Sequence, residues 1–218
     1  MNRVLVPVIV LAAAAGVGLM GSPVAAQTII EEWANVKAPP PPQLKEVTAD
    51  PKTTALLVMD LVKQTCNNER RPRCVASIPK IEKLLAEART KGAMVIYTTV
   101  PPTPIADTLP AIAPKSNEPV VTAWVDKFTL VNQDTGLEKM LKDKGITTVI
   151  AVGTAANGAV LYTSSAAALR GFNVIVPVDG MSGDGQNTYI EQYVAFNLTS
   201  APVVSPKVTL TRIDIIKF

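Results

Sequence analysis

Short runs of apolar residues alternate along this chain with helical patterns, and this alternation constrains the fold more than any other feature. The run 55–59 is apolar at every position, which is typical of a strand covered on both faces. Strands joined by helices form right-handed βαβ units around a parallel sheet. We therefore expect an α/β fold, a three-layer αβα sandwich with a mostly parallel, Rossmann-like sheet of about six strands. The expected strands are 55–59, 94–97, 147–152, 174–176 and 208–213, and the expected helices are 77–89, 135–144, 157–170 and 187–198.

The first 26 residues have the pattern of a signal peptide. Arg3 supplies a basic end, residues 4–20 are apolar, and Val24 and Ala26 suit a signal-peptidase site. The alternative is an uncleaved anchor, because the apolar stretch is close to the length that spans a bilayer. We expect cleavage after residue 26, which makes the mature protein periplasmic or secreted, with no membrane association.

The mature chain is expected to have two parts. Residues 27–52 form an N-terminal arm, with a short helix over 28–36 and a polyproline spacer over 39–42. Residues 53–218 carry the alternating pattern and form one domain. The net charge of +3, without a basic stripe, argues against nucleic acid as a partner.

Cys66 and Cys74 are the only cysteines, and they lie in a polar segment. In an exported protein such a pair predicts a disulfide; the alternatives are a catalytic thiol or a metal pair. The chain has no histidine, which excludes Ser-His-Asp and Cys-His catalysis and any zinc site that needs imidazole. Without histidine, any acid–base chemistry must use carboxylates, lysines, tyrosines or water. We expect neither a metal nor a cofactor.

Ligands of parallel αβ sheets bind beyond the carboxyl ends of the strands. The expected strand ends carry Asp60, residues 98–102, the turn at Gly153 and Asp179. Three segments carry the candidate chemistry: Asp60 follows the first strand, Lys127 follows a proline-rich loop over 101–119, and residues 153–160 lead from a strand through a turn into a helix. The arginines of the segment after the first strand, Arg70, Arg71 and Arg73, could select an anionic substrate or belong to a solvated loop.

The order and spacing of these segments resemble the isochorismatase-like cysteine hydrolases, over roughly residues 53–213. The segment 135–141 after the lysine is similar to a helix of that family, with Asn132 where the family has phenylalanine. Segments 145–153 and 164–174 are similar to its fourth strand, the next helix and its fifth strand. The resemblance implies an isochorismatase-like fold, a small-molecule substrate and a homo-oligomeric assembly.

The resemblance also implies roles for individual residues. In members with the thiol, the aspartate at Asp60 takes the proton of the nucleophile and the lysine at Lys127 supports the pair electrostatically. The nucleophilic cysteine would stand at position 159, where this chain has alanine. Without a nucleophile, covalent hydrolysis loses about 10⁶-fold in rate.

Residues around position 159 would bind the substrate. Backbone N–H groups at a helix start stabilise an oxyanion, so Ala155, Ala156 and Gly158 are expected to line the substrate site. Trp124 could line the same pocket or lie in the core.

Three interpretations are compatible with Ala159. Some isochorismatases lack the cysteine, and there the aspartate protonates a vinyl ether as a general acid while water completes hydrolysis. We therefore expect an exported hydrolase of a small molecule, with Asp60 as general acid or base assisted by Lys127. The alternative is a pseudoenzyme that binds a small molecule or a partner protein in the periplasm. An engineered cysteine-to-alanine substitution that traps substrate is a third possibility.

Overall fold

The computed structural model describes residues 28–185 and 187–218, which divide into two units at residues 38 and 39. The predicted signal peptide falls on residues 1–26, outside the described part. In the described part of the first unit, a short helix, α1 (Ile29–Glu32), is followed by a 3₁₀ turn. The side chains of Thr28 and Glu31 cap the start of α1. No helix among the described residues is long and apolar enough to cross a membrane.

The second unit is built on a parallel sheet, as the apolar runs predict. Within the described residues the sheet has seven strands, in the order β10-β8-β7-β2-β3-β4, with β9 pairing with β7. Every pairing in this sheet is parallel. The strands are β2 (Thr54–Met59), β3 (Met94–Thr99), β4 (Val120–Thr122), β7 (Thr148–Thr154), β8 (Asn173–Pro177), β9 (Met181–Ser182) and β10 (Val208–Thr211).

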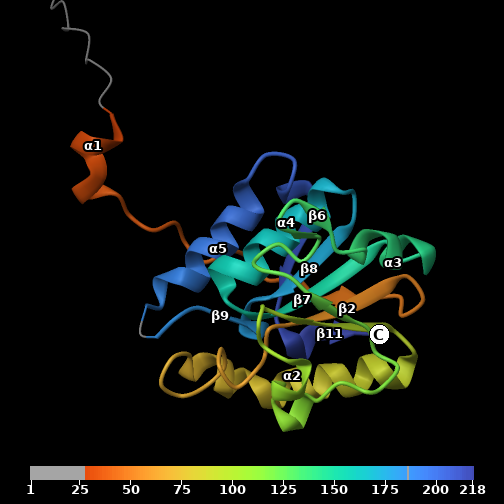
Figure 1. Cartoon of the computed structure of the whole chain (residues 1–218). Coiled ribbons are helices and arrows are strands. Elements are labelled where there is room, and N and C mark those ends of the chain that lie inside the picture. Colours follow the sequence, from red (N-terminus) through yellow and green to blue (C-terminus); the bar gives the residue numbers. More distant parts are fainter. Residues whose placement is uncertain (1–27, 186) are drawn as a thin grey trace, which may run out of the picture. The chain divides into compact units, whose positions relative to one another are not determined.

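Helices cover both faces of this sheet, so the predicted three-layer α/β fold is confirmed. Figure 1 shows α2 (Pro72–Lys91) below the sheet, with α3 (Leu137–Asp143), α4 (Leu161–Leu169) and α5 (Tyr189–Ser200) above it. The two apolar layers divide in the same way, because α2 packs in one buried cluster and the other three helices pack in a second one. Strand β2 contributes side chains to both clusters, which explains its unbroken apolar run.

Two predicted helix starts are wrong, for different physical reasons. Helix α2 begins at Pro72 and not at residue 77, because a proline in the first turn needs no hydrogen-bond acceptor for its missing N–H. The helix expected from residue 157 begins at Leu161. Residues Ala156–Val160 form a π-helical turn instead, in which Gly158 has φ −119° and ψ −108°, outside the helical region.

Part of the segment expected as an arm joins the second unit. Strand β1 (Val47–Thr48) pairs with β11 (Ile216–Lys217), and the backbone N–H of Lys45 donates to the carbonyl of Leu210. The short antiparallel pair β5 (Thr129–Leu130) and β6 (Gln133–Asp134) follows Lys127.

The two cysteines form the predicted disulfide, Cys66–Cys74, with Cα atoms 5.5 Å apart. Both residues are buried, and they close the loop between β2 and α2 on itself.

Replacing both cysteines by alanine should lower the free energy of unfolding by about 2–3 kcal/mol, because the unfolded chain regains the entropy of this short loop. Urea unfolding of the variant and of the oxidised protein measures the difference. Equal midpoints and slopes would contradict this expectation.

Candidate active site

Asp60 stands at the carboxyl edge of the sheet, directly after β2. Its φ of +55° lies in the left-handed region, which is uncommon for a residue other than glycine. Neighbouring strands hold the backbone in place: the Asp60 N–H donates to the carbonyl of Thr98 at 3.2 Å. The Asp60 carbonyl accepts hydrogen bonds from the hydroxyls of Thr65 and Thr154, the latter at 3.1 Å. The carboxyl group is therefore presented by a backbone that three other segments fix.

Strand register explains why these residues meet. Met59 is paired with Thr98 on β3 and with Gly153 on β7, so the residues that follow reach the same edge of the sheet. At Gly153 the strands approach so closely that a Cβ atom would lie 2.1 Å from the carbonyl oxygen of Met59. Only glycine fits this position.

The structure brings Asp60 and Lys127 together. The Lys127 Nζ lies 2.7 Å from Asp60 Oδ2, and the hydroxyl of Thr98 donates to Oδ1 at 2.6 Å. The ammonium group also donates to the carbonyls of Ala123 and Trp124, at 2.8 and 2.6 Å. Asp60 is 2% exposed and Lys127 is fully buried. All three protons of the ammonium group thus have acceptors within the protein.

Burial shifts the protonation of both groups toward their neutral forms. Desolvation raises the pKa of Asp60, although Lys127, Thr98 and Arg71 oppose the shift. Desolvation likewise lowers the pKa of Lys127, against the attraction of Asp60. A carboxyl with a raised pKa next to an ammonium with a lowered pKa is an arrangement that can hold a proton and release it.

The turn after β7 lies next to this pair. On its near side, the Thr154 hydroxyl binds the Asp60 carbonyl. On its far side, the Thr163 hydroxyl accepts from the Lys127 N–H and donates to the Val125 carbonyl, both at 3.2 Å. Ala159, one helical turn before Thr163, is buried in the core cluster that contains Phe128. In the sequence, position 159 therefore lies between Thr154, which binds the Asp60 carbonyl, and Thr163, which binds the Lys127 N–H.

The other predicted substrate residues fall into two groups. Ala155, Ala156 and Gly158 all belong to the turn, and the Gly158 N–H donates to the Ala155 carbonyl at 2.9 Å. Trp124 is 51% exposed, which contradicts the core alternative for this side chain. Its backbone carbonyl, and not its indole, takes part in the site through the bond to Lys127.

Sequence reasoning missed the threonines that surround the pair. Thr65, Thr98, Thr154 and Thr163 each bind the backbone or side chain of Asp60, or the backbone around Lys127. Thr98 and Thr154 carried a signal in the sequence, since each lies at or next to the last residue of a strand that pairs with β2. Among residues 28–185 and 187–218, no group of three or more metal-ligating side chains is placed to hold a metal ion.

The chain thus combines a parallel αβα sandwich with a buried carboxylate–ammonium pair at the carboxyl edge of its sheet. Residues 54–205 match the family model of the isochorismatase domain, and the chain belongs to this family. The comparison with curated proteins finds no match.

Solved structures show the same fold. An isochorismatase from Pseudomonas putida KT2440 aligns with a TM-score of 0.65 at 16% identity, over 88% of this chain and 100% of that one. The N-carbamoylsarcosine amidase from Thermoplasma acidophilum aligns at 0.57 and 21% identity, over 74% and 97%. A nicotinamidase from Staphylococcus aureus aligns at 0.59 and 15%, over 69% and 94%. At these identities the similarity establishes the fold.

Proposed function

We propose that this protein is an exported hydrolase of a small molecule that works without a thiol, in which Ala159 takes the position of the family's nucleophile. The observation that carries the proposal is the Asp60–Lys127 pair, with 2.7 Å between Nζ and Oδ2, in a chain whose position 159 holds a side chain that cannot form a covalent intermediate. A pair kept only for stability could be replaced by apolar residues without loss, because burying two charges costs solvation energy.

In this mechanism Asp60 acts as a general acid. Its carboxyl gives a proton to the substrate, water adds to the resulting cation, and the proton that the water loses restores the acid. Lys127 stabilises the Asp60 carboxylate that forms after proton transfer, because the ammonium group and the carboxylate have opposite charges. The raised pKa of Asp60 supports the assignment, since a general acid must be protonated when the substrate arrives.

The second candidate is a small-molecule-binding protein without catalysis. It is favoured by the saturated hydrogen bonding of Lys127 and by the burial of both charged groups, which leave the pair closed to solvent. In that case the pair would fix the shape of the site without transferring a proton.

Mass spectrometry separates the two candidates. The mature protein and its Ala159→Cys variant would be incubated with a library of small carboxylates, amides and enol ethers. We expect the native protein to release products that have gained one water, with no mass added to the protein. We expect the Ala159→Cys variant alone to form a covalent acyl adduct with amides. A ligand recovered intact with both proteins would contradict hydrolysis and support the binding alternative.

The proposed export rests on the N-terminal pattern and gains support from the disulfide. Buried disulfides are rare in reducing compartments and common in the periplasm and outside the cell. Expression of the full chain and N-terminal sequencing of the product tests it: a mature protein that begins at Gln27 is expected. An intact Met1 in the exported fraction would contradict cleavage.

A further inference from the structure

Two neighbouring arginines in the disulfide-bonded loop share a single carboxylate oxygen. Arg71 Nη2 lies 2.5 Å from Oδ1 of Asp184, and Arg70 Nε lies 3.2 Å from the same atom. Asp184 belongs to the segment between β9 and α5, far away in the sequence. Two positive charges thus meet one negative charge, which leaves this cluster with an excess of one positive charge.

Arg71 is buried, and its hydrogen bonding is incomplete. Its side chain is 4% exposed, and Nη1 donates to the carbonyl of Thr65 at 2.7 Å. Its Nε is buried and has no hydrogen-bond partner among the described residues. A buried donor without an acceptor is uncommon in native proteins and indicates a missing partner.

Two other arginines of this chain show what the missing partner would be. Arg73 binds Glu191 through Nε and Nη2, at 2.7 and 3.1 Å to the two carboxylate oxygens. Arg89 binds Glu118 through the same two nitrogens, both at 2.8 Å. This edge of a guanidinium group matches a carboxylate in two parallel bonds. In Arg71 the edge is half used, because Asp184 reaches Nη2 and leaves Nε empty.

Another anion could take the place of Asp184 at Arg71, but Arg71 could not remain without any anion. The Asp184 side chain is 61% exposed, so it returns to water without a large desolvation change. Arg71 must keep an anion, because an uncompensated buried charge is strongly destabilising. A ligand carboxylate that fills both Nε and Nη2 would therefore replace Asp184 without leaving the arginine unpaired.

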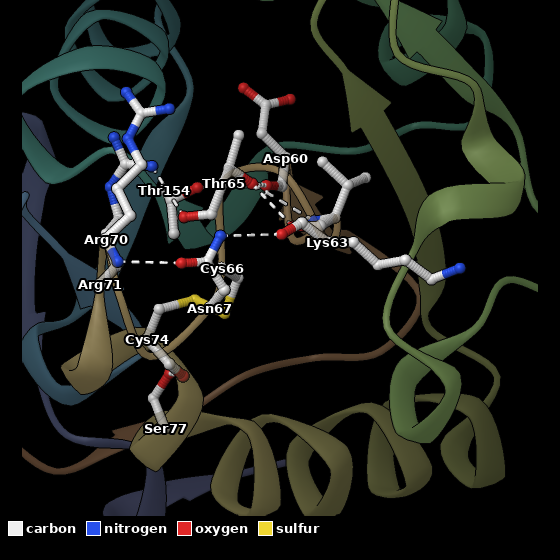
Figure 2. Close-up of a disulfide and its surroundings, with 11 residues drawn as sticks. Asp60, Lys63, Thr65, Cys66, Asn67, Arg70, Arg71, Cys74, Ser77 and Thr154 are labelled. Atoms are coloured by element: carbon white, nitrogen blue, oxygen red, sulfur yellow. Dashed lines mark hydrogen bonds between the residues drawn. A yellow bond between two sulfur atoms is a disulfide. The ribbon is translucent and has the colours of Figure 1, made fainter.

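The arginines lie on the side of the loop where Asp60 stands. Figure 2 shows the side chains of Asp60, Arg70 and Arg71 extending in the same direction from the loop that Cys66–Cys74 closes. Thr65 connects them, since its carbonyl accepts from Arg71 and its hydroxyl donates to the Asp60 carbonyl. An anion held by Arg71 would thus lie on the same side of the loop as the acid.

We propose that Arg71, assisted by Arg70, binds the carboxylate of a small anionic substrate, and that Asp184 occupies this position in the unliganded protein. The carboxylate site specifies the substrate class of the proposed hydrolase. It rests on the proposed function only for the proton transfer that is assigned to Asp60. Binding itself can be tested without any turnover.

The test measures benzoate binding by calorimetry and by thermal unfolding, with sodium chloride at equal ionic strength as the reference. Asp184→Asn removes the competing carboxylate, so benzoate affinity should rise about tenfold or more over the native protein, and benzoate should raise the Tm of this variant by several degrees. Asp143→Asn is the matched control, because it removes an exposed carboxylate paired with Lys139, away from the arginines. It should leave benzoate affinity unchanged.

Two further variants decide the assignment. Arg71→Lys in the Asp184→Asn background should lose the gained affinity, because a lysine cannot form the two parallel bonds. Asp60→Asn should still bind benzoate, because the arginines and not Asp60 hold the anion. Benzoate binding therefore tests the arginine site separately from the proposed proton transfer by Asp60. Equal affinities of native and Asp184→Asn protein, or a gain that survives Arg71→Lys, would overturn the proposal.

Discussion

Replacing Lys127 by methionine is expected to lower the free energy of unfolding by about 3–5 kcal/mol at pH 8. The change removes the ammonium group that lies 2.7 Å from Asp60 and leaves a buried carboxyl with one hydroxyl partner. It also leaves the carbonyls of Ala123 and Trp124 without their donor. Urea unfolding at several pH values measures the loss.

The loss should depend on pH in a defined direction. Burial already raises the pKa of Asp60, and without Lys127 the pKa rises further. The folded variant then holds a proton that the unfolded chain releases above its ordinary pKa of about 3.9. The variant therefore loses stability as pH rises from that value toward the folded pKa, and it should be less impaired at pH 5 than at pH 8.

Two controls isolate the ion pair. Lys139→Met breaks an exposed pair with Asp143, which should cost less than about 1 kcal/mol. The double variant Asp60→Asn, Lys127→Met buries neither charge of this pair, so it should be more stable than Lys127→Met alone. A single-variant loss that does not change with pH would show that packing, and not the unpaired carboxyl, causes it.

Sequence patterns predict the sheet of this protein because each central strand has a short apolar run of its own in the sequence. The run at 55–59 is apolar at every position, and the same holds at 149–152, so both strands could be placed to within two residues. The edge where ligands bind follows from the parallel connections, which is why Asp60 and the turn after β7 could be named together. The family resemblance added Lys127, which no local pattern marks as buried.

The conformations at the site depend on contacts between distant segments. The left-handed backbone of Asp60 is held by contacts with Thr65, Thr98 and Thr154, which the sequence around Asp60 does not reveal. The π-helical turn before α4 arises at Gly158, whereas residues 157–170 read as one continuous helix. The carboxylate partners of Arg70, Arg71 and Arg73 lie more than a hundred residues away, so neither these pairings nor the burial of Arg71 could be read from a basic, polar segment.

Asp60→Asn is expected to reduce kcat/KM for the substrate found by mass spectrometry by about 10²–10⁴-fold, the usual contribution of a positioned acid. Asparagine is nearly the same size as aspartate, and its carbonyl can still accept a hydrogen bond from Lys127. The ammonium group loses its counterion, so the variant should be less stable than the native protein, and its amide cannot give up a proton. Circular dichroism and urea unfolding establish that the structure is kept.

The pH dependence of the reaction separates an acid from a structural group. If protonated Asp60 is the acid, native kcat/KM falls about tenfold per pH unit above its raised pKa, and Asp60→Asn loses this dependence together with most of the rate. The matched control is Asp179→Asn, because Asp179 follows the neighbouring strand β8 and binds the Ile213 N–H and Lys80. Its removal should leave the pH profile unchanged. A slow Asp60→Asn enzyme that keeps the native profile would show that Asp60 shapes the site while another group moves the proton.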